Sequence, residues 1–290
     1  MTLEKKSPCK VNLILNILGK RADGFHELET VMHPVNLFDE MQFERTGGDV
    51  QLTCSNPALP TDSGNLVHRA AMLFFQKTEI RDGVRIHLEK KIPMAAGLGG
   101  GSGNAATTLL GLDELFGKPL QAKALEDIAA SLGSDIPFFL QTKPGLGTGR
   151  GEKIESLENF PAMAGAAFVL VHPGFGISTP WAYQNLARFP AALNGTPGRA
   201  RKLISLLQTA DLRTAGREFY NSLEAPALDK YPLLTLFQDF FRENGALATL
   251  MSGSGSTTFA LAENPSAAGQ LAEKFKAKFG ETHWLAVVPV

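Results

Sequence analysis

The glycine-rich stretch PMAAGLGGGSGNAA, residues 93–106, constrains the fold more than any other feature of this chain. It follows the segment GVRIHLEKKIP, in which apolar and polar residues alternate as in a strand. After it, Ala105, Leu109, Leu112 and Phe116 recur at helical spacing. A strand, a glycine loop and a helix form the layout of a phosphate site, because the first turn of a helix offers free N–H donors and glycines allow the backbone to approach an anion.

Three known glycine motifs do not account for this stretch. A P-loop requires a lysine followed by serine or threonine after its last glycine, and none is present. Gly101, Gly103 and Ala106 formally meet the dinucleotide fingerprint, but the region where its second strand belongs, LQAKALEDIAASLG, has a helical pattern. The nucleophile elbow G-x-S-x-G is absent. A nucleotide-phosphate loop is the favoured interpretation, and a plain flexible connection is the alternative.

Strand-like and helix-like segments alternate irregularly along the rest of the chain. Apolar alternation or continuous apolar runs predict strands near residues 9–18, 31–35, 39–44, 50–54, 84–89, 166–173, 247–261 and 283–290. Helical spacing predicts helices near residues 63–78, 105–116, 120–133, 181–186, 200–209 and 230–244, with one more before the last strand. KPGLGTGRGE, residues 143–152, predicts a hairpin or linker. This order predicts an α+β fold in two lobes.

Composition narrows the classes of partner. The formal net charge is −1, so no basic excess points to nucleic acid or to an anionic membrane surface. The longest apolar runs are too short to span a bilayer, and the N-terminal residues lack the apolar region of a secretory signal. Two cysteines without a C-x-x-C pair predict a reduced protein of the cytoplasm without a disulfide framework or zinc site.

Three segments together resemble the GHMP kinases, the superfamily of galactokinase, homoserine kinase and mevalonate kinase. PCKVNLILNI resembles the first motif of that family, PMAAGLGGGSGNAA its phosphate loop, and MSGSGSTTFAL its third, glycine-rich motif. They occur in the family's order and span almost the whole chain. The segments RADGFHEL and GSDIPFFL further resemble the branch that acts on 4-diphosphocytidyl-2-C-methyl-D-erythritol.

This resemblance implies a two-lobed fold. The N-terminal lobe, residues 1–153, would resemble ribosomal protein S5 domain 2, and the C-terminal lobe, residues 154–290, would be a ferredoxin-like α/β lobe. The active site would lie in the cleft between them.

The implied reaction is ATP-dependent phosphorylation of the 2-hydroxyl of 4-diphosphocytidyl-2-C-methyl-D-erythritol, a step of non-mevalonate isoprenoid synthesis. The implied cofactors are ATP and Mg²⁺, with no protein metal site. The protein would act as a monomer or homodimer on a small molecule. Two alternatives are a GHMP kinase for mevalonate or homoserine and a non-catalytic nucleotide sensor.

The resemblance also implies the residues that hold ATP. Asn65 matches the segment on the adenine side, although Asn in this context is also a typical helix N-cap. Ser102 would contact a phosphate or Mg²⁺, and a plain N-cap is its alternative. Where many members have a second serine or small residue, this chain has Gly103, which leaves fewer hydroxyl groups for the metal. The implied phosphate-loop residues are Pro93, Met94, Ala95, Ala96, Gly97, Leu98, Gly99, Gly100, Gly101, Ser102 and Gly103.

Two charged residues match the catalytic positions of the family. Asp135 in GSDIPFFL would accept the hydroxyl proton, although Asp before Ile-Pro is also a common turn or cap residue. Lys10 would pair with Asp135 and offset charge on the transferred group, and an exposed edge lysine is the alternative.

The acceptor pocket is implied by residues from two distant segments. Phe25 stands where the family usually has Tyr, so it keeps the stacking surface for cytosine and loses the phenol hydrogen bond. His26 would read the cytosine edge, and Tyr183 would stack from the other side or belong to the core. Asn12 and Thr179 would line the same pocket.

Overall fold

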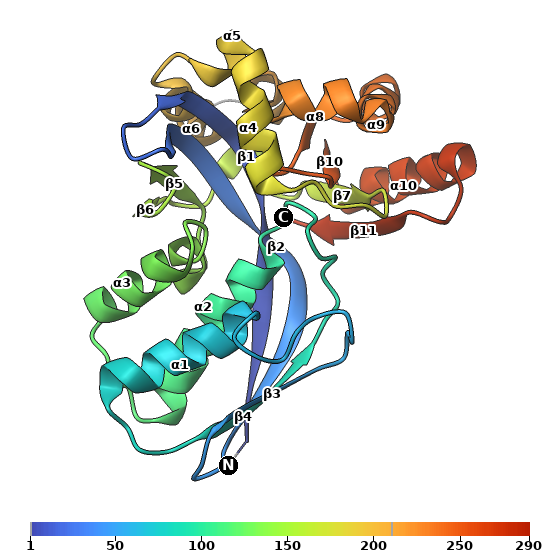
Figure 1. Cartoon of the computed structure of the whole chain (residues 1–290). Helices are drawn as coiled ribbons and strands as arrows, with labels where there is room; N and C mark the ends of the chain where they lie inside the picture. The colour runs from blue at the N-terminus through green and yellow to red at the C-terminus, as the bar shows by residue number, and fades with distance from the viewer. Residues whose placement is uncertain (1, 210) are drawn as a thin grey trace. The chain divides into compact units, whose positions relative to one another are not determined.

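The computed structural model describes residues 2–209 and 211–290. Helices and strands are mixed along the chain (Figure 1), which confirms the α+β class. The chain forms two compact units, each built from separated segments. The first comprises Met1–Cys9, Leu37–Ile92 and Gly99–Thr142; the second comprises Lys10–Asn36, Pro93–Leu98 and Lys143–Val290. The expected division at residues 153 and 154 stays a prediction.

The first unit is a small sheet with helices packed on it. Strand β4 (Val84–Glu89) pairs parallel with β3 (Val50–Cys54) and antiparallel with the end of β2 (His26–Arg45). Helix α2 packs against β2 at Gly111, where an added Cβ would lie 3.0 Å from the Phe43 ring. The unit's helical elements are α1 (Leu66–Thr78), α2 (Gly100–Leu115), α3 (Ala122–Leu132) and the 3-10 turn η1 (Pro137–Leu140).

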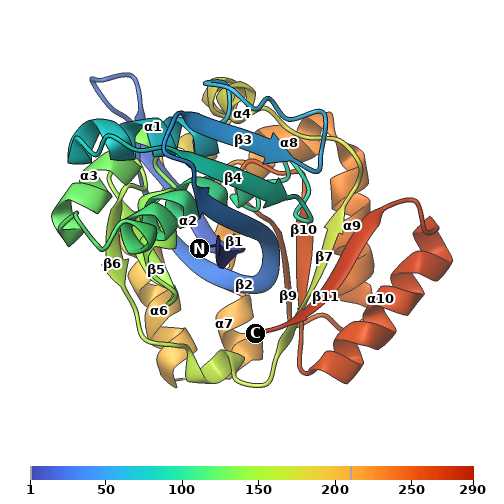
Figure 2. The ribbon, with the colours of Figure 1, turned by 90° about the horizontal axis from the view of Figure 1, so that it is seen from below.

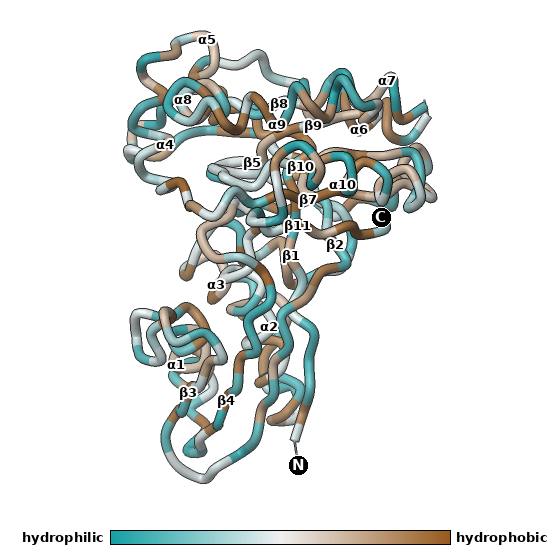
Figure 3. Tube along the Cα trace, turned by 90° about the vertical axis from the view of Figure 1, so that its right-hand side faces the viewer, coloured by the Kyte–Doolittle hydropathy of each residue, from teal (hydrophilic) through white to brown (hydrophobic). Residues whose placement is uncertain are grey.

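A four-stranded antiparallel sheet organises much of the second unit. Its order is β11 (Trp284–Pro289), β7 (Ala167–His172), β10 (Thr258–Ala262) and β9 (Ala248–Met251). Side chains alternate between the faces of a strand, so Val169 and Ala260, which are paired, point to the same face. Helices α9 (Pro232–Glu243) and α10 (Pro265–Phe279) cover this face (Figure 2) and contribute its phenylalanines. All six β7 residues are buried, which agrees with their largely apolar sequence (Figure 3).

The remainder of the second unit is built on β1 (Thr2–Lys20) and β2. In this unit β1 pairs parallel with β8 (Tyr220–Asn221) through Ile14 and Leu15. β2 pairs antiparallel with β5 (Gly145–Thr148), which forms with β6 (Lys153–Ser156) the hairpin predicted from KPGLGTGRGE. The shorter helical elements are η2 (Pro161–Met163), α4 (Thr179–Asn185), η3 (Leu186–Arg188), α5 (Pro190–Leu193), α6 (Arg199–Thr209), α7 (Leu212–Gly216) and α8 (Glu224–Lys230).

Four predicted strands were wrong in their extent. The strand predicted near residues 9–18 begins at Thr2 and ends at Lys20. The segments 31–35 and 39–44 form one continuous strand, because the carboxylate of Asp39 is buried with its charge paired and does not interrupt β2. The segment 247–261 forms two strands, β9 and β10, separated by a turn that contains Gly253 and Gly255. Among the described residues, no helix has both the length and the apolar character that crossing a membrane requires.

Candidate functional site

The backbone at Gly97 requires glycine. Its φ is +76°, and an added Cβ would lie 2.0 Å from the carbonyl oxygen of Ser252. The Ser252 hydroxyl donates a hydrogen bond of 2.9 Å to the Gly97 carbonyl oxygen. In the second unit the segment around Gly97 and the third glycine motif therefore meet backbone to backbone.

Lys10 lies at this junction and is buried, with 2% of its surface exposed. Its Nζ donates to Asn12 Oδ1 at 2.6 Å and to the Gly97 carbonyl oxygen at 3.0 Å. Asn12 in turn donates through Nδ2 to Thr30 Oγ1 at 2.8 Å. The alternative of a solvent-exposed edge lysine is wrong, because this ammonium group is held among buried acceptors. The structure thus brings together Lys10, Asn12 and Gly97 within the second unit.

In the first unit, α2 begins at Gly100, five residues earlier than its apolar spacing predicts. Gly99 is the N-cap in a left-handed conformation, and the Gly103 N–H donates to the Gly99 carbonyl. A Cβ on Gly103 would lie 2.3 Å from the Pro8 carbonyl oxygen, so glycine lets the helix approach β1. Ser102 is the third residue of this helix, so the N-cap alternative for Ser102 is wrong.

A buried ion pair lies beside the first turn of α2. Asp39 is fully buried, and its carboxylate accepts from Lys90 Nζ at 2.6 Å and Asn104 Nδ2 at 2.9 Å. Two backbone N–H groups, of Lys91 and Ile92, also donate to it at 2.7 and 2.8 Å. Sequence reasoning missed this cluster, because Asp39 and Lys90 each stand beside a second charged residue and read as exposed.

Asp135 and Asn65 also belong to the first unit. Asp135 lies half-buried in the turn between α3 and η1. Asn65 caps α1, because its Oδ1 accepts from the Val67 N–H at 2.9 Å and its Nδ2 donates to the Pro60 carbonyl at 2.8 Å. The catalytic role of Asp135, its pairing with Lys10 and the adenine contact of Asn65 stay predictions.

The residues predicted for the acceptor pocket all belong to the second unit, where the structure brings His26 and Tyr183 together. The rings of His26 and Tyr183 are 5.0 Å apart between centroids, and Tyr183 also packs on the edge of an apolar core. Thr179 and Ser254 share a hydrogen bond of 2.8 Å between their hydroxyl groups. Phe25 is 51% exposed. Burial, with the charge of Lys20 as a second cause, lowers the pKa of His26, which favours a neutral ring with one donor and one acceptor nitrogen.

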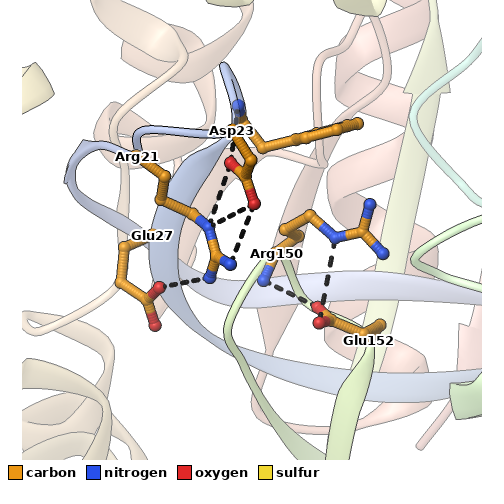
Figure 4. A network of polar contacts seen from close by, with 6 residues as sticks. Arg21, Asp23, Glu27, Arg150 and Glu152 are labelled. Atoms are coloured by element: carbon orange, nitrogen blue, oxygen red, sulfur yellow. Dashed lines mark hydrogen bonds and ion pairs between the residues drawn. The ribbon is translucent and has the colours of Figure 1, made fainter.

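Ion pairs hold the loop that carries Phe25. Arg21 forms salt bridges with Asp23 at 3.0 Å and with Glu27 at 2.7 Å (Figure 4). Hydrogen bonding to Arg21 lowers the pKa of Asp23. The Phe25 N–H donates to Asp23 Oδ1 at 3.1 Å. The segment RADGFHEL therefore folds as an ordered turn that presents an exposed aromatic ring.

Glu224 is buried in the second unit, where it supports the third glycine motif. Its Oε1 accepts from the Met251 N–H at 2.7 Å and from Gln238 Nε2 at 2.5 Å. Burial raises its pKa from the ordinary 4.5 to about 6, and the opposing effects of these two donors and of Arg242 are smaller. The folded state therefore binds this proton more tightly than the unfolded state does.

We expect Glu224→Gln to remove a pH-dependent loss of stability. In the parent protein the contribution of the protonated group is complete below pH 4.5 and is lost as the pH rises to about 6. This loss amounts to about 2 kcal/mol and should be absent from the variant, whose amide oxygen still accepts from Met251. Urea unfolding of both proteins at pH 4 and 7.5 measures it. An equal pH dependence in both proteins would contradict the assignment.

Two family models match the chain. The model described as GHMP kinases N terminal domain matches residues 65–143, and that described as GHMP kinases C terminal matches residues 200–281. The 4-diphosphocytidyl-2-C-methyl-D-erythritol kinase of Acaryochloris marina is 39% identical, over 93% of this chain and 90% of the relative. The kinase of the same name from Syntrophotalea carbinolica is 37% identical over 98% of each chain.

Solved structures give a consistent comparison. A crystal structure of 4-(cytidine 5'-diphospho)-2C-methyl-D-erythritol kinase aligns with a TM-score of 0.80 and 33% identity, and it covers 99% of this chain and 100% of that chain. A homoserine kinase from Cytophaga hutchinsonii aligns with a TM-score of 0.77 and 20% identity over 100% and 94% of the two chains. The second similarity concerns the fold alone.

Proposed function

The chain belongs to the GHMP kinase family, and we propose from this membership that it uses ATP to phosphorylate the 2-hydroxyl of 4-diphosphocytidyl-2-C-methyl-D-erythritol. The family resemblance predicted from the motifs is confirmed. Relatives that are 37–39% identical along most of the chain are named for this activity, which belongs to non-mevalonate isoprenoid synthesis. On the structural side, the observation that carries the proposal is the buried Lys10 ammonium group beside the Gly97 turn.

The glycine-rich segment Pro93–Gly103 is the candidate for binding the ATP phosphates. Glycine is required at Gly97 and at Gly103, because other backbone atoms approach both positions closely. The first N–H groups of α2 have no partner within the helix, and its dipole favours an anion there. We assign the ATP phosphates to this segment, with the Ser102 hydroxyl as a further donor and Asn65 on the adenine side.

Two residues carry the transfer. The substrate 2-hydroxyl oxygen attacks the γ-phosphorus of ATP, the bond to the β,γ-bridging oxygen breaks, and ADP leaves. The Asp135 carboxylate accepts the hydroxyl proton. Lys10 supplies positive charge as negative charge develops on the transferred group, and Asn12 and the Gly97 carbonyl orient its ammonium group.

We assign binding of the cytosine base to aromatic residues of the second unit. Phe25 and Tyr183 supply stacking surfaces, and the neutral His26 ring hydrogen-bonds the base edge. Asn12 and Thr179 line the acceptor side. Phe25 lacks the hydroxyl of the tyrosine usual in the family, so its contribution is stacking alone.

Mg²⁺ is assigned to the ATP phosphates rather than to a protein cage. No group of three or more potential ligands from His, Cys, Asp and Glu gathers among residues 2–209 and 211–290. Mg²⁺ at phosphoryl-transfer sites is held largely by substrate phosphates and water. We also assign the protein to the cytoplasm, in keeping with its two cysteines, which form no C-x-x-C pair, and expect a monomer or homodimer.

A panel of acceptors tests the proposed function. With ATP and Mg²⁺, ADP release is expected with 4-diphosphocytidyl-2-C-methyl-D-erythritol and not with mevalonate or homoserine. Phosphorus NMR of the product is expected to show a new phosphomonoester on the erythritol moiety. Phosphorylation of mevalonate or homoserine in preference to the cytidyl compound would refute the substrate assignment. Tight ATP binding without any turnover would favour the nucleotide sensor instead.

A further inference from the structure

One face of the exposed Phe25 ring is occupied by an arginine from a distant segment. The guanidinium carbon of Arg150 lies 4.6 Å from the centroid of the Phe25 ring. Phe25 precedes β2, whereas Arg150 lies in the turn between β5 and β6. The Leu28 N–H donates to the Gly149 carbonyl at 2.9 Å, so a backbone hydrogen bond ties the two segments together. The contact therefore joins two loops that are held in register.

Arg150 and Phe25 each have further contacts within their own loops. The backbone N–H of Arg150 donates to Glu152 Oε2 at 2.7 Å, and Arg150 Nε lies 3.8 Å from Glu152 Oε1. On the other side, the Arg21 N–H donates to the Phe25 carbonyl at 2.8 Å, and the Phe25 N–H donates to Asp23. Figure 4 shows Arg150 and Glu152 beside the Arg21 and Asp23 network. The backbone of both residues is thus held by hydrogen bonds, and the Arg150 guanidinium group has an ion pair with Glu152 beside its contact with the ring.

We propose that Arg150 is a positioning residue for the cytosine-stacking ring of Phe25. A guanidinium group on one face leaves only the opposite face of Phe25 for a nucleobase, and the cation–π attraction restricts rotation of the ring before the substrate arrives. Phe25 has no hydroxyl that could anchor it by a hydrogen bond, so the contact with Arg150 takes that place. This inference rests on the assignment of the cytidyl substrate made above.

An alternative role for Arg150, direct binding of the substrate diphosphate, predicts a different result for variants of Arg150 and Phe25. A guanidinium group that bound the diphosphate of the substrate directly would act without Phe25, because phosphate recognition needs no aromatic platform. A positioning role acts through Phe25 and disappears with it. A double-mutant cycle separates these two cases, since it measures whether the two residues act together.

The cycle consists of Arg150→Gln, Phe25→Ala and the double variant. We expect Arg150→Gln to raise KM for the cytidyl substrate by about fivefold, the size that an exposed cation–π contact supports, with kcat and the KM for ATP within about twofold of the parent. Phe25→Ala is expected to raise the same KM further. The double variant is expected to match Phe25→Ala, and Arg150→Lys to fall between the parent and Arg150→Gln.

Arg45 provides a matched control, because its guanidinium carbon also lies 4.6 Å from a ring centroid, that of Phe116 in the first unit. Arg45→Gln is expected to leave KM unchanged, and thermal unfolding of each variant reports on its folding. Provided that the parent protein is active on the cytidyl compound, two results would overturn the inference. One is an unchanged KM in Arg150→Gln; the other is a rise in KM on adding Arg150→Gln to Phe25→Ala that equals the rise in the parent. A parent protein inactive on the cytidyl compound would overturn the proposed function and this inference with it.

Discussion

Asp135→Ala is expected to lower kcat by about 10²–10⁴-fold while ATP binding changes by less than about twofold. A positioned carboxylate that accepts the proton of an attacking hydroxyl contributes a rate factor of this size, and it acts in the transition state rather than on the bound nucleotide. Single-turnover phosphoryl transfer at saturating ATP measures the first quantity. Titration with a fluorescent nucleotide measures the second.

Asp127→Ala is the matched control for this experiment. Asp127 lies on α3 in the same unit and makes an exposed salt bridge of 2.8 Å with Lys123. Its removal is expected to leave kcat unchanged. A rate for Asp135→Ala close to that of the parent would show that Asp135 is not the base. A proportional loss of ATP binding would instead assign Asp135 to nucleotide binding.

Asp39→Ala is expected to lower the free energy of unfolding by about 3–5 kcal/mol, because it leaves the buried Lys90 ammonium group without its counter-ion. The backbone N–H groups of Lys91 and Ile92 lose their acceptor as well. The Lys90 Nζ lies close to Gly100, since a Cβ on that glycine would be 3.2 Å from it. Removal of the Asp39 carboxylate should therefore also raise the KM for ATP, because the first turn of α2 is no longer held in place.

The neighbouring ion pair of Glu40 and Lys91 is the control. Its distance is also 2.6 Å, but both side chains are about half exposed. Glu40→Ala should scarcely move the urea midpoint, because solvent screens exposed ion pairs. A double variant without both charges, Asp39→Leu with Lys90→Met, is expected to be more stable than Asp39→Ala. Equal midpoints for Asp39→Ala and Glu40→Ala would refute the role assigned to the buried pair.

Much of the site was predictable because its signals are local. Apolar spacing predicts α1 and α3, the turn residues of KPGLGTGRGE predict a hairpin or linker at β5 and β6, and three motifs in a fixed order indicate the family. Glycine at 97 is a local signal too, because a left-handed backbone angle excludes most other residues. Gly103 also marks a close approach of backbone atoms, although the sequence does not identify the partner atom.

The contacts that only the tertiary structure reveals join residues far apart in the chain. The pairing of Asp39 with Lys90 joins positions 51 residues apart, and the contact of Lys10 with Gly97 joins positions 87 residues apart. The sequence around Asp39, Lys90 and Lys10 does not distinguish these buried charged residues from exposed ones. The contact of Gly103 in α2 with the Pro8 carbonyl likewise joins positions far apart in the chain.

The sequence by itself determined the class of fold, the family and the position of the glycine-rich segment, because backbone preference and side-chain periodicity depend on neighbouring residues. The tertiary structure alone decided which charges are buried and which ring Arg150 covers. The physical reason is that the cost of burying a charge, and the contact that offsets it, depend on groups brought together by folding.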